Sequence, residues 1–236
     1  MLPVAILAGG LATRLHPTTL TIPKSLIKVA GKPFIFHQLK NLREQGITDI
    51  VLCTGHLGEM IKSYVGDGSK FDLKILYSSD GRKLLGTGGA IKKALPLLGN
   101  QFFILYGDTY LPIKFDSIEQ SYLSNNFSYL MTVLKNDGMW DQSNAFFVND
   151  RLIEYNKKNP TSKMRYIDYG LSIVSKNIFD KYSEDTFFDL SDIFHYLSKQ
   201  RQLVGLEVFK RFYEIGTPNS LKETEGFLSN LNIRRK

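Results

Sequence analysis

Short apolar runs alternate with amphipathic stretches through the first half of the chain, and this alternation constrains the fold most strongly. The runs are rich in residues that favour β-structure and predict strands at residues 4–7, 50–53, 73–77 and 102–106. Strands joined by helical crossovers pair in parallel and need helices above and below them. We therefore expect an α/β fold in which a mostly parallel mixed sheet has helices on both faces.

The intervening helices are predicted from apolar spacing and from residues that start or stop a helix. Pro33 suits the first position of a helix that stops at Gly46, since no partner for its missing N–H is needed there. Apolar residues repeat at helical spacing over residues 60–65 and again over residues 90–95. These three helices lie between the four predicted strands, as a parallel sheet requires.

The second half of the chain has a different pattern. Asn149-Asp150 is a hairpin-turn signal between extended runs at residues 145–148 and 152–155, and another extended run covers residues 166–174. These runs predict a small antiparallel insertion. Helical spacing returns over residues 190–197, a strand is expected at 204–208, and an amphipathic helix covers residues 221–228.

Composition excludes several classes of protein. No segment has the roughly 20 consecutive apolar residues of a membrane span, and the N-terminus lacks a basic secretion signal, so we expect a cytoplasmic protein with no membrane partner. Lys and Arg outnumber Asp and Glu by 30 to 23, which suits an anionic substrate. No nucleic-acid-binding motif is present, and neither Cys53 nor the histidines have metal-ligand spacing. A homo-oligomer remains open.

The strongest local motif follows the first predicted strand. It reads Leu-Ala-Gly-Gly-Leu-Ala-Thr-Arg-Leu over residues 7–15, and Lys24 follows ten residues after Arg14. The glycines permit close backbone approach to an anion, and their exposed N–H groups can line a concavity for phosphate. Arg14 offers a planar fork of donors and Lys24 a mobile point charge, which together suit a triphosphate. A tight turn with two solvated cations is the alternative.

A carboxylate marks the end of the fourth predicted strand. Tyr106-Gly107-Asp108 places Asp108 where open α/β sheets bind their ligands. Magnesium is held by one or two carboxylates together with substrate phosphate oxygens, so Asp108 suits a Mg²⁺ site. An ordinary loop aspartate is the alternative.

Residues 7–15 with Pro23-Lys24 resemble the signature of nucleotidyltransferases that activate sugar 1-phosphates. The resemblance extends through Asp108 to Gly216, nearly the whole chain. It implies a Rossmann-like nucleotidyltransferase fold in a single domain over residues 1–236. The nucleotide-binding half would cover about residues 1–112 and the sugar-binding half about residues 113–236. The implied reaction joins a nucleoside triphosphate to a sugar 1-phosphate and gives a nucleotide sugar and pyrophosphate.

The same resemblance implies roles for individual residues. Arg14 and Lys24 would act in catalysis by neutralising the departing pyrophosphate. Asp108 and Glu214 would hold Mg²⁺, although Glu214 stands where the family usually has aspartate, and a solvated strand-end acid is its alternative. The residues expected to bind the nucleotide are Leu7, Ala8, Gly9, Gly10, Thr13, Gly86, Thr87 and Gly88.

The sugar would be bound by Glu154, Asn156, Lys157 and Asp168. Residues 152–158 resemble the family's sugar-binding strand, in which Lys157 matches the lysine and Asn156 replaces a glutamate. Strand alternation places Glu154 and Asn156 on one face and Lys157 on the other, unless a bulge intervenes. Asp168 is a candidate acceptor for a sugar hydroxyl, with turn capping as its alternative.

The donor base is ambiguous between guanine and uracil. Residues 85–90 resemble the base-contacting loop of mannose- and heptose-1-phosphate guanylyltransferases, and their glycines would leave room for a purine. Residues 66–69 and 94–99 look more like N-acetylmuramate 1-phosphate uridylyltransferase. We favour GTP, with UTP as the alternative. Two other readings remain open: a non-catalytic binding module, suggested by Ala12 in place of glycine and by Glu214, and a phosphocholine cytidylyltransferase, which would need an aromatic cage.

Overall fold

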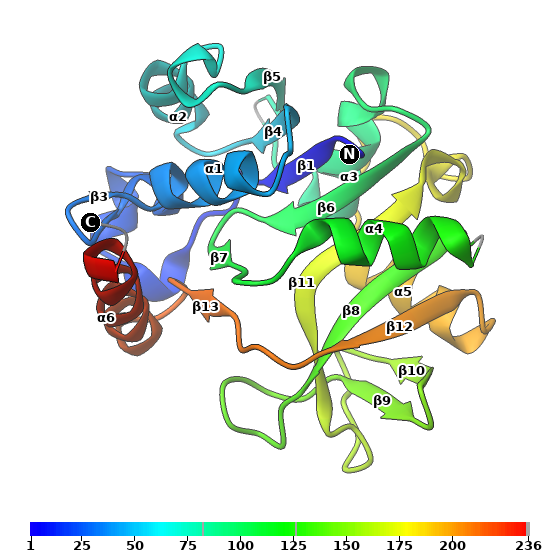
Figure 1. The fold of residues 1–236 in the computed structure, drawn as a ribbon. Helices are drawn as coiled ribbons and strands as arrows, with labels where there is room; N and C mark the ends of the chain where they lie inside the picture. The colour runs from blue at the N-terminus through cyan, green and yellow to red at the C-terminus, as the bar shows by residue number, and fades with distance from the viewer. Residues whose placement is uncertain (82, 126, 235–236) are drawn as a thin grey trace.

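The computed structural model describes residues 1–81, 83–125 and 127–234 (Figure 1). Its main sheet contains nine strands: seven lie in the order β5-β4-β1-β6-β11-β8-β12, and β9 and β10 join it at β11. Among the seven, every neighbouring pair runs parallel except the two that involve β11, so the predicted mostly parallel sheet is confirmed. The strands are β1 Val4–Leu7, β4 Asp49–Thr54, β5 Lys74–Ser79, β6 Gln101–Tyr106, β8 Tyr129–Lys135, β11 Tyr166–Ser175 and β12 Leu203–Val208. The first, second, third and fourth predicted strands are β1, β4, β5 and β6.

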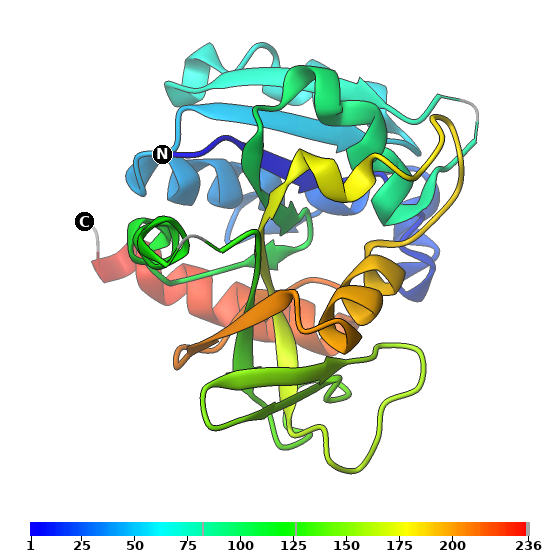
Figure 2. The same cartoon turned by 90° about the vertical axis from the view of Figure 1, so that its right-hand side faces the viewer.

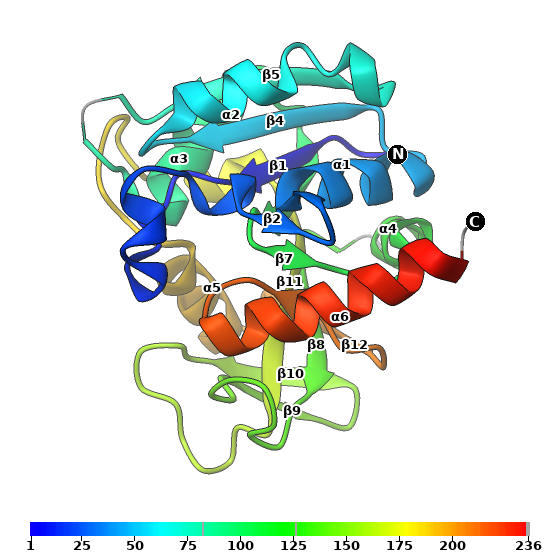
Figure 3. The ribbon, with the colours of Figure 1, turned by 90° about the vertical axis from the view of Figure 1, so that its left-hand side faces the viewer.

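Helices cover both faces of this sheet, as expected. Val4 and Ile6 of β1 belong to a core shared with α1 (Phe34–Glu44), α2 (Gly58–Val65) and α4 (Phe115–Ser124). Ala5 points to the opposite core, which contains apolar side chains of α3 (Gly86–Ala94) and α5 (Leu190–Lys199). The alternation of side chains along one buried strand therefore supplies both cores. Figure 3 shows α3 and α5 on the left and α1 and α4 on the right.

The antiparallel insertion extends the sheet at the end opposite β5 (Figures 2 and 3). Strands β9 (Ala145–Val148) and β10 (Arg151–Tyr155) form the predicted hairpin. Asn149 and Asp150 both have positive φ, 50° and 57°, which is the conformation of the two-residue turn that suits the twist of a hairpin. A single register contact joins Ala145 of β9 to Tyr166 of β11.

A third, smaller core connects the C-terminal helix to the centre of the molecule. Helix α6 (Pro218–Arg234) contributes Leu228, which packs with Val29, Phe34, Tyr110 and Ile215. Two short ladders border this core: β2 (Lys28–Val29) with β3 (Lys32–Pro33), and β7 (Thr109–Tyr110) with β13 (Tyr213–Glu214). Figure 3 shows α6 crossing below α1. The second ladder brings the late segment of the chain beside the end of β6.

The structure corrects one helix boundary. Pro33 was predicted as the first residue of a helix, but α1 begins at Phe34 and Pro33 has an extended ψ of 142°. Pairing of Pro33 with Lys28 in the β2–β3 ladder holds it in that conformation. The remaining short elements are 3-10 turns at Thr13–Leu15, Thr18–Leu20, Lys24–Leu26, Ser69–Phe71, Leu95–Leu97 and Lys176–Phe179. Among the helices of the described ranges, none combines the length and apolar character needed to span a membrane.

Candidate active site

The candidate site lies where the strand order reverses. From β1 the chain first adds β4 and β5 on one side and then β6 on the other, and ligands of open α/β sheets bind outside the strand ends at such a point. The loop after β1 and the loop after β6 touch there: the N–H of Gly107 donates to the Leu7 carbonyl over 2.9 Å. A Cβ on Gly107 would lie 2.7 Å from that oxygen, so only glycine permits this approach.

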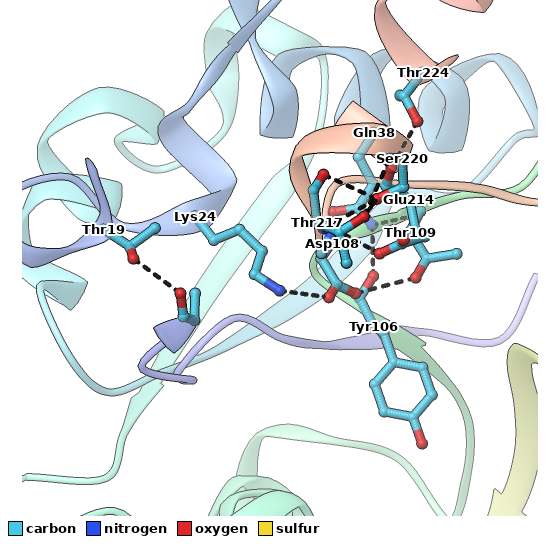
Figure 4. Close-up of polar contacts among 12 residues, drawn as sticks. Thr19, Lys24, Gln38, Tyr106, Asp108, Thr109, Glu214, Thr217, Ser220 and Thr224 are labelled. Carbon is cyan, nitrogen blue, oxygen red and sulfur yellow. Dashed lines mark hydrogen bonds and ion pairs between the residues drawn. The ribbon is translucent and has the colours of Figure 1, made fainter. Parts of the chain in front are cut away.

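Lys24 and Asp108 meet at this edge of the sheet. The Lys24 Nζ lies 2.9 Å from Asp108 Oδ2, and the Thr109 hydroxyl donates to Asp108 Oδ1 over 3.0 Å (Figure 4). Burial alone would raise the pKa of Asp108, but the Lys24 ammonium and these hydrogen bonds outweigh it and hold the pKa below its usual value. Asp108 is therefore an anion at neutral pH.

The buried side chain of Gln38 fixes the backbone on both sides of Asp108. Its Nε2 donates to the carbonyls of Tyr106 and Thr109, each over 2.9 Å (Figure 4). Gln38 belongs to α1, which is part of the main core, so the carboxylate stands on a rigid support.

The β7–β13 ladder holds Glu214 beside the segment that carries Asp108. Its register partner is Thr109, and the N–H of Ile215 donates to the Asp108 carbonyl over 3.0 Å. The Glu214 carboxylate accepts a hydrogen bond from the N–H of Gly216, and the Thr224 hydroxyl donates to the Glu214 carbonyl over 2.7 Å (Figure 4). The side chain of Glu214 is thus folded back on its own loop.

Two cavities meet at Tyr106 and Asp108, whose side chains line both. The first, of about 300 Å³, is lined by Leu7, Ala8, Gly9, Gly10, Ala12, Lys24, Ser25, Asp80, Leu84, Gly86, Thr87, Ala90, Tyr106, Gly107, Asp108, Phe187 and Asp189. The second, of about 330 Å³, has a wall of aromatic and charged side chains that includes Arg14, Trp140, Lys157, Asp168, Arg211 and Glu214. Each cavity is large enough for part of a small-molecule substrate.

Most residues predicted to bind the nucleotide line the first cavity. Of the eight, six do so: Leu7, Ala8, Gly9, Gly10, Gly86 and Thr87. Thr13 is exposed in a 3-10 turn and lines neither cavity. Gly88 is buried behind the cavity wall, where its N–H donates to the Phe188 carbonyl over 2.9 Å.

The glycines of α3 have a different role from the one expected. A Cβ on Gly88 would lie 2.3 Å from the Phe188 ring, and a Cβ on Gly86 or Gly89 would lie 2.6 or 2.4 Å from the carbonyls of Phe188 or Thr186. The space beside these glycines is therefore filled by residues 186–188. The expectation that it would admit a purine is wrong, because a distant segment of the chain packs there.

Replacing Gly88 with alanine is expected to lower the free energy of unfolding by about 1–3 kcal/mol, since the new methyl group overlaps the Phe188 ring. Gly226→Ala is the matched control. Gly226 lies on α6 with nothing within 4 Å of an added Cβ, so alanine there should leave stability equal or slightly higher. Urea unfolding followed by circular dichroism measures both. Equal midpoints for Gly88→Ala and wild type would contradict the packing role.

The second cavity contains two of the four predicted sugar-binding residues. Lys157 and Asp168 line it, together with Arg14 and Glu214. Glu154 lies elsewhere, with its carboxylate 3.8 Å from Lys199 Nζ. Asn156 accepts a hydrogen bond from the N–H of Asn159 and does not line the cavity.

Side-chain alternation explains this separation. The β9–β10 register shifts between Leu152 and Glu154, before the stretch that leads from Glu154 to Lys157, and β10 ends at Tyr155. Lys157 follows in a loop, and its Nζ lies 6.0 Å from the centre of the Tyr106 ring. Lys157 therefore lines the cavity, as Tyr155 does, while Glu154 and Asn156 do not, which is the separation that strand alternation predicts.

Asp168 both closes a turn and lines the second cavity. Its Oδ1 accepts from the N–H of Gly170 over 2.9 Å, and its own N–H donates to Asn144 Oδ1 over 2.8 Å. Burial raises the pKa of Asp168, against the opposing effects of the Gly170 hydrogen bond and the Lys157 charge. A hydroxyl donor from a ligand would further stabilise this partly desolvated carboxylate.

Several cavity residues were missed by the sequence analysis. In the first cavity these are Ser25, Asp80, Phe187 and Asp189, and in the second Asn144, Tyr169 and Arg211. The Ser25 hydroxyl is buried without a hydrogen-bond partner among the described residues, which suits an acceptor on a ligand. Because Ser25 directly follows Lys24 in the sequence, it could have been predicted as a site residue. The others reach the cavities through long-range packing that no local pattern reveals.

Comparisons with known proteins give matches over half of the chain or more. A model of the nucleotidyl transferase family matches residues 4–139. D-glycero-alpha-D-manno-heptose 1-phosphate guanylyltransferase from Campylobacter jejuni is 32% identical over 215 residues, which cover 90% of this chain and 94% of the relative. N-acetylmuramate alpha-1-phosphate uridylyltransferase from Neisseria meningitidis is 31% identical over 225 residues, with coverage of 93% and 95%.

Solved structures share the fold. HddC from Yersinia pseudotuberculosis, complexed with GMP-PN, superposes with a TM-score of 0.81 at 26% identity, covering 97% of this chain and 100% of that one. A putative glucose-1-phosphate thymidylyltransferase from Bacillus anthracis gives a TM-score of 0.85 at 23% identity, with coverage of 98% and 96%. The α/β architecture described above is therefore that of solved nucleotidyltransferases.

Proposed function

The chain belongs to the nucleotidyl transferase family, and on that premise we propose that it transfers a nucleotidyl group from a nucleoside triphosphate to a sugar 1-phosphate and releases pyrophosphate. The observation that supports this most is the pair of cavities that meet at Asp108. The first would take the nucleotide and the second the sugar 1-phosphate. At their junction the two substrates would then meet end to end.

The two cavities suggest how the single domain is organised. The N-terminal half, about residues 1–112, supplies most of the nucleotide cavity, and the C-terminal half, about residues 113–236, most of the sugar cavity. Each half also contributes residues to the cavity that the other half mainly lines: Phe187 and Asp189 line the nucleotide cavity, and Arg14 lines the sugar cavity. The two halves would thus act as one domain.

The reaction requires the protein to position the two substrates and to supply positive charge. An oxygen of the sugar phosphate attacks the α-phosphorus, the bond from that phosphorus to the bridging oxygen breaks, and pyrophosphate leaves with the electron pair. The nucleophile is already an anion, so no general base is required. Lys24, in the first cavity, would stabilise the pyrophosphate as it departs, and residues 8–10 would bring their backbone to the nucleotide. Arg14 lines only the second cavity, so its charge would offset the repulsion between the anions from the side of the sugar phosphate, and the pyrophosphate role expected from the sequence falls to Lys24.

Asp108 and Glu214 fit a magnesium ion in the manner usual for nucleotide enzymes. They are carboxylates from two paired segments, Asp108 is held as an anion, and hydrogen bonds fix the backbone of both. Among the described residues, no three or more acidic, histidine or cysteine side chains are placed together to hold a metal ion, so the remaining ligands would be substrate oxygens and water. Bound there, magnesium would supply charge stabilisation at the phosphate.

We propose GTP as the nucleotide donor and a mannose- or heptose-type 1-phosphate as the acceptor. Residues 85–90, at the start of α3 and directly before it, resemble the guanylyltransferases, and the Campylobacter relative is named for a heptose 1-phosphate. A UTP-dependent sugar-1-phosphate uridylyltransferase is the second candidate, because the Neisseria relative is similar to nearly the same extent.

Pyrophosphate release tests this function. GTP, UTP, CTP, ATP and dTTP would each be incubated with magnesium and with mannose, heptose, glucose and N-acetylmuramate 1-phosphates, and with phosphocholine. We expect release that depends on both substrates and on magnesium. Nucleotide binding without release in any combination would instead favour a non-catalytic module.

Lys157→Ala is expected to raise KM for the sugar 1-phosphate about tenfold and to leave KM for the nucleotide nearly unchanged, because the Lys157 ammonium lines only the second cavity. Lys158→Ala is the control, since Lys158 Nζ pairs with Asp192 over 2.6 Å and lines neither cavity. Steady-state kinetics with each substrate varied in turn measure both constants. An equal rise in both KM values would contradict a role confined to the sugar.

A further inference from the structure

Asp80 is a nearly buried carboxylate in the wall of the first cavity, and the reaction described above makes no use of it. Its exposed fraction is 9%. It follows β5, the edge strand, and so lies at the same edge of the sheet as Asp108 but three strands away from it. Its N–H donates to the Thr54 carbonyl over 2.8 Å, so its backbone is tied to the end of β4. Its Oδ2 accepts from the N–H of Leu85 over 3.1 Å. The carboxylate is therefore held in one place.

The sheet order sets which end of the nucleotide meets Asp80. Strands β5, β4, β1 and β6 are neighbours, so the ends of β5 and β6 are three strand spacings apart, roughly 14 Å at about 4.8 Å per strand. The phosphates belong near residues 8–10 and Lys24, at the ends of β1 and β6. A nucleotide that lies along this edge therefore points its base toward the end of β5, where Asp80 stands.

The walls at this end suit a flat base. Leu84, Ala90 and Phe187 line the same cavity and offer apolar contact surfaces. Phe187 is an aromatic side chain that is 65% exposed, so its ring is accessible for stacking against a base. Beside these apolar residues, the Asp80 carboxylate offers a charged acceptor at the end of β5.

The second carboxylate of the cavity is engaged elsewhere. Asp189 Oδ1 accepts hydrogen bonds from the N–H and the hydroxyl of Thr87, at 3.3 and 3.2 Å. Asp189 precedes α5, and both of these hydrogen bonds hold it against the first turn of α3. The strand order therefore assigns the base edge to Asp80, which directly follows β5.

A carboxylate only accepts hydrogen bonds, and each of its oxygens can accept more than one. Of the five standard bases, guanine alone presents two neighbouring donors on its Watson–Crick edge, N1–H and the N2 amino group. Uracil and thymine present one N–H between two carbonyl oxygens, which a carboxylate would repel. Adenine and cytosine present an acceptor beside their donor. A buried carboxylate at the base edge therefore discriminates in favour of guanine.

We propose that Asp80 is the residue that determines base specificity and that it selects guanine by accepting hydrogen bonds from N1–H and the N2 amino group. This inference rests on the proposed function, because it assigns the donor of that reaction. The Leu85 N–H and the apolar walls orient the carboxylate, and the lost bond to any other base gives the selectivity.

The test compares GTP with ITP, which lacks the N2 amino group, and with XTP, which has a carbonyl there. For the wild type we expect kcat/KM to be about 10- to 100-fold higher with GTP than with ITP, the typical effect of one charged hydrogen bond. In Asp80→Asn the kcat/KM values for GTP and ITP should become nearly equal, and kcat/KM for XTP should rise relative to that for GTP. The reason is that the amide group donates a hydrogen bond where the carboxylate accepted one. The amide oxygen of this variant can still accept from the N–H of Leu85, and an unchanged melting temperature would verify the fold.

Asp189→Asn is the matched control, since it removes the other carboxylate of the cavity. It should keep the wild-type ratio of GTP to ITP whatever its effect on absolute rate. An unchanged ratio in Asp80→Asn, or a wild type that prefers UTP to GTP, would overturn this inference and leave the proposed function standing. If no substrate pair releases pyrophosphate, the proposed function fails instead. In that case the dissociation constants of GTP and ITP, measured by calorimetry for the wild type and for Asp80→Asn, test the role of Asp80 through the same GTP-to-ITP ratio.

Discussion

Asp108→Asn is expected to lower kcat by about 10²- to 10⁴-fold while the protein stays folded. The substitution keeps the size of the side chain and removes its charge, and a metal-holding carboxylate typically contributes several kcal/mol to the transition state. The charge also pairs with Lys24 at 2.9 Å, so the variant leaves that ammonium without its partner carboxylate. Pyrophosphate release at saturating magnesium measures the loss, and circular dichroism the fold.

Asp150→Asn provides the control for the chemical change. Asp150 is exposed in the β9–β10 turn with a positive φ of 57°, a conformation that asparagine accepts as readily as aspartate. Its activity should equal that of the wild type. Retention of more than about a tenth of wild-type kcat by Asp108→Asn at saturating magnesium would argue against a metal-holding role, since a loss below tenfold is under about 1.4 kcal/mol.

The parallel half of the sheet could be predicted from the sequence because its signals are local. Strand β1 has the predicted bounds of residues 4–7, and β4, β5 and β6 lie within one or two residues of prediction. Such strands are buried on both faces and appear as continuous apolar runs that glycine or polar residues end. The β9–β10 hairpin was predicted for a similar reason, since Asn149-Asp150 is a turn signal in itself.

The elements that were not predicted depend on distant parts of the chain. Strand β8 is a continuous apolar run directly after α4, and periodicity alone does not separate a buried strand from a helix. The two-residue strands β7 and β13 exist only through their mutual pairing and the third core. That pairing is what sets Glu214 beside Asp108.

The candidate site shows the same division. The loop after β1 and the end of β6 each have a local signature, and parallel strands bring both to one edge, so the meeting of Lys24 and Asp108 follows from the sequence. The packing of residues 186–188 against the glycines of α3 does not, since these segments are about a hundred residues apart. Asp80 was missed because its neighbours in the sequence give no sign that its carboxylate faces a cavity.

Lys24→Ala is expected to reduce kcat/KM by about 10²-fold or more and to shift the acid side of the pH–rate profile to higher pH. The first effect follows from loss of the charge that stabilises the departing pyrophosphate. The second has a definite sign: Lys24 helps to hold the pKa of Asp108 below its usual value, so its removal raises that pKa. Asp108 then becomes protonated at a higher pH, and activity that needs its anion is lost there.

A double-mutant cycle with Asp108→Asn separates the two effects of Lys24. Because the two side chains share one ion pair, their combined loss should be smaller than the product of the single losses. Lys28→Ala is the control, since Lys28 is an exposed residue of β2 that lines neither cavity, and it should leave both rate and profile unchanged. Strictly multiplicative losses together with an unshifted acid limb would show that Lys24 acts independently of Asp108. Near-wild-type kcat/KM for Lys24→Ala would remove it from the stabilisation of pyrophosphate altogether.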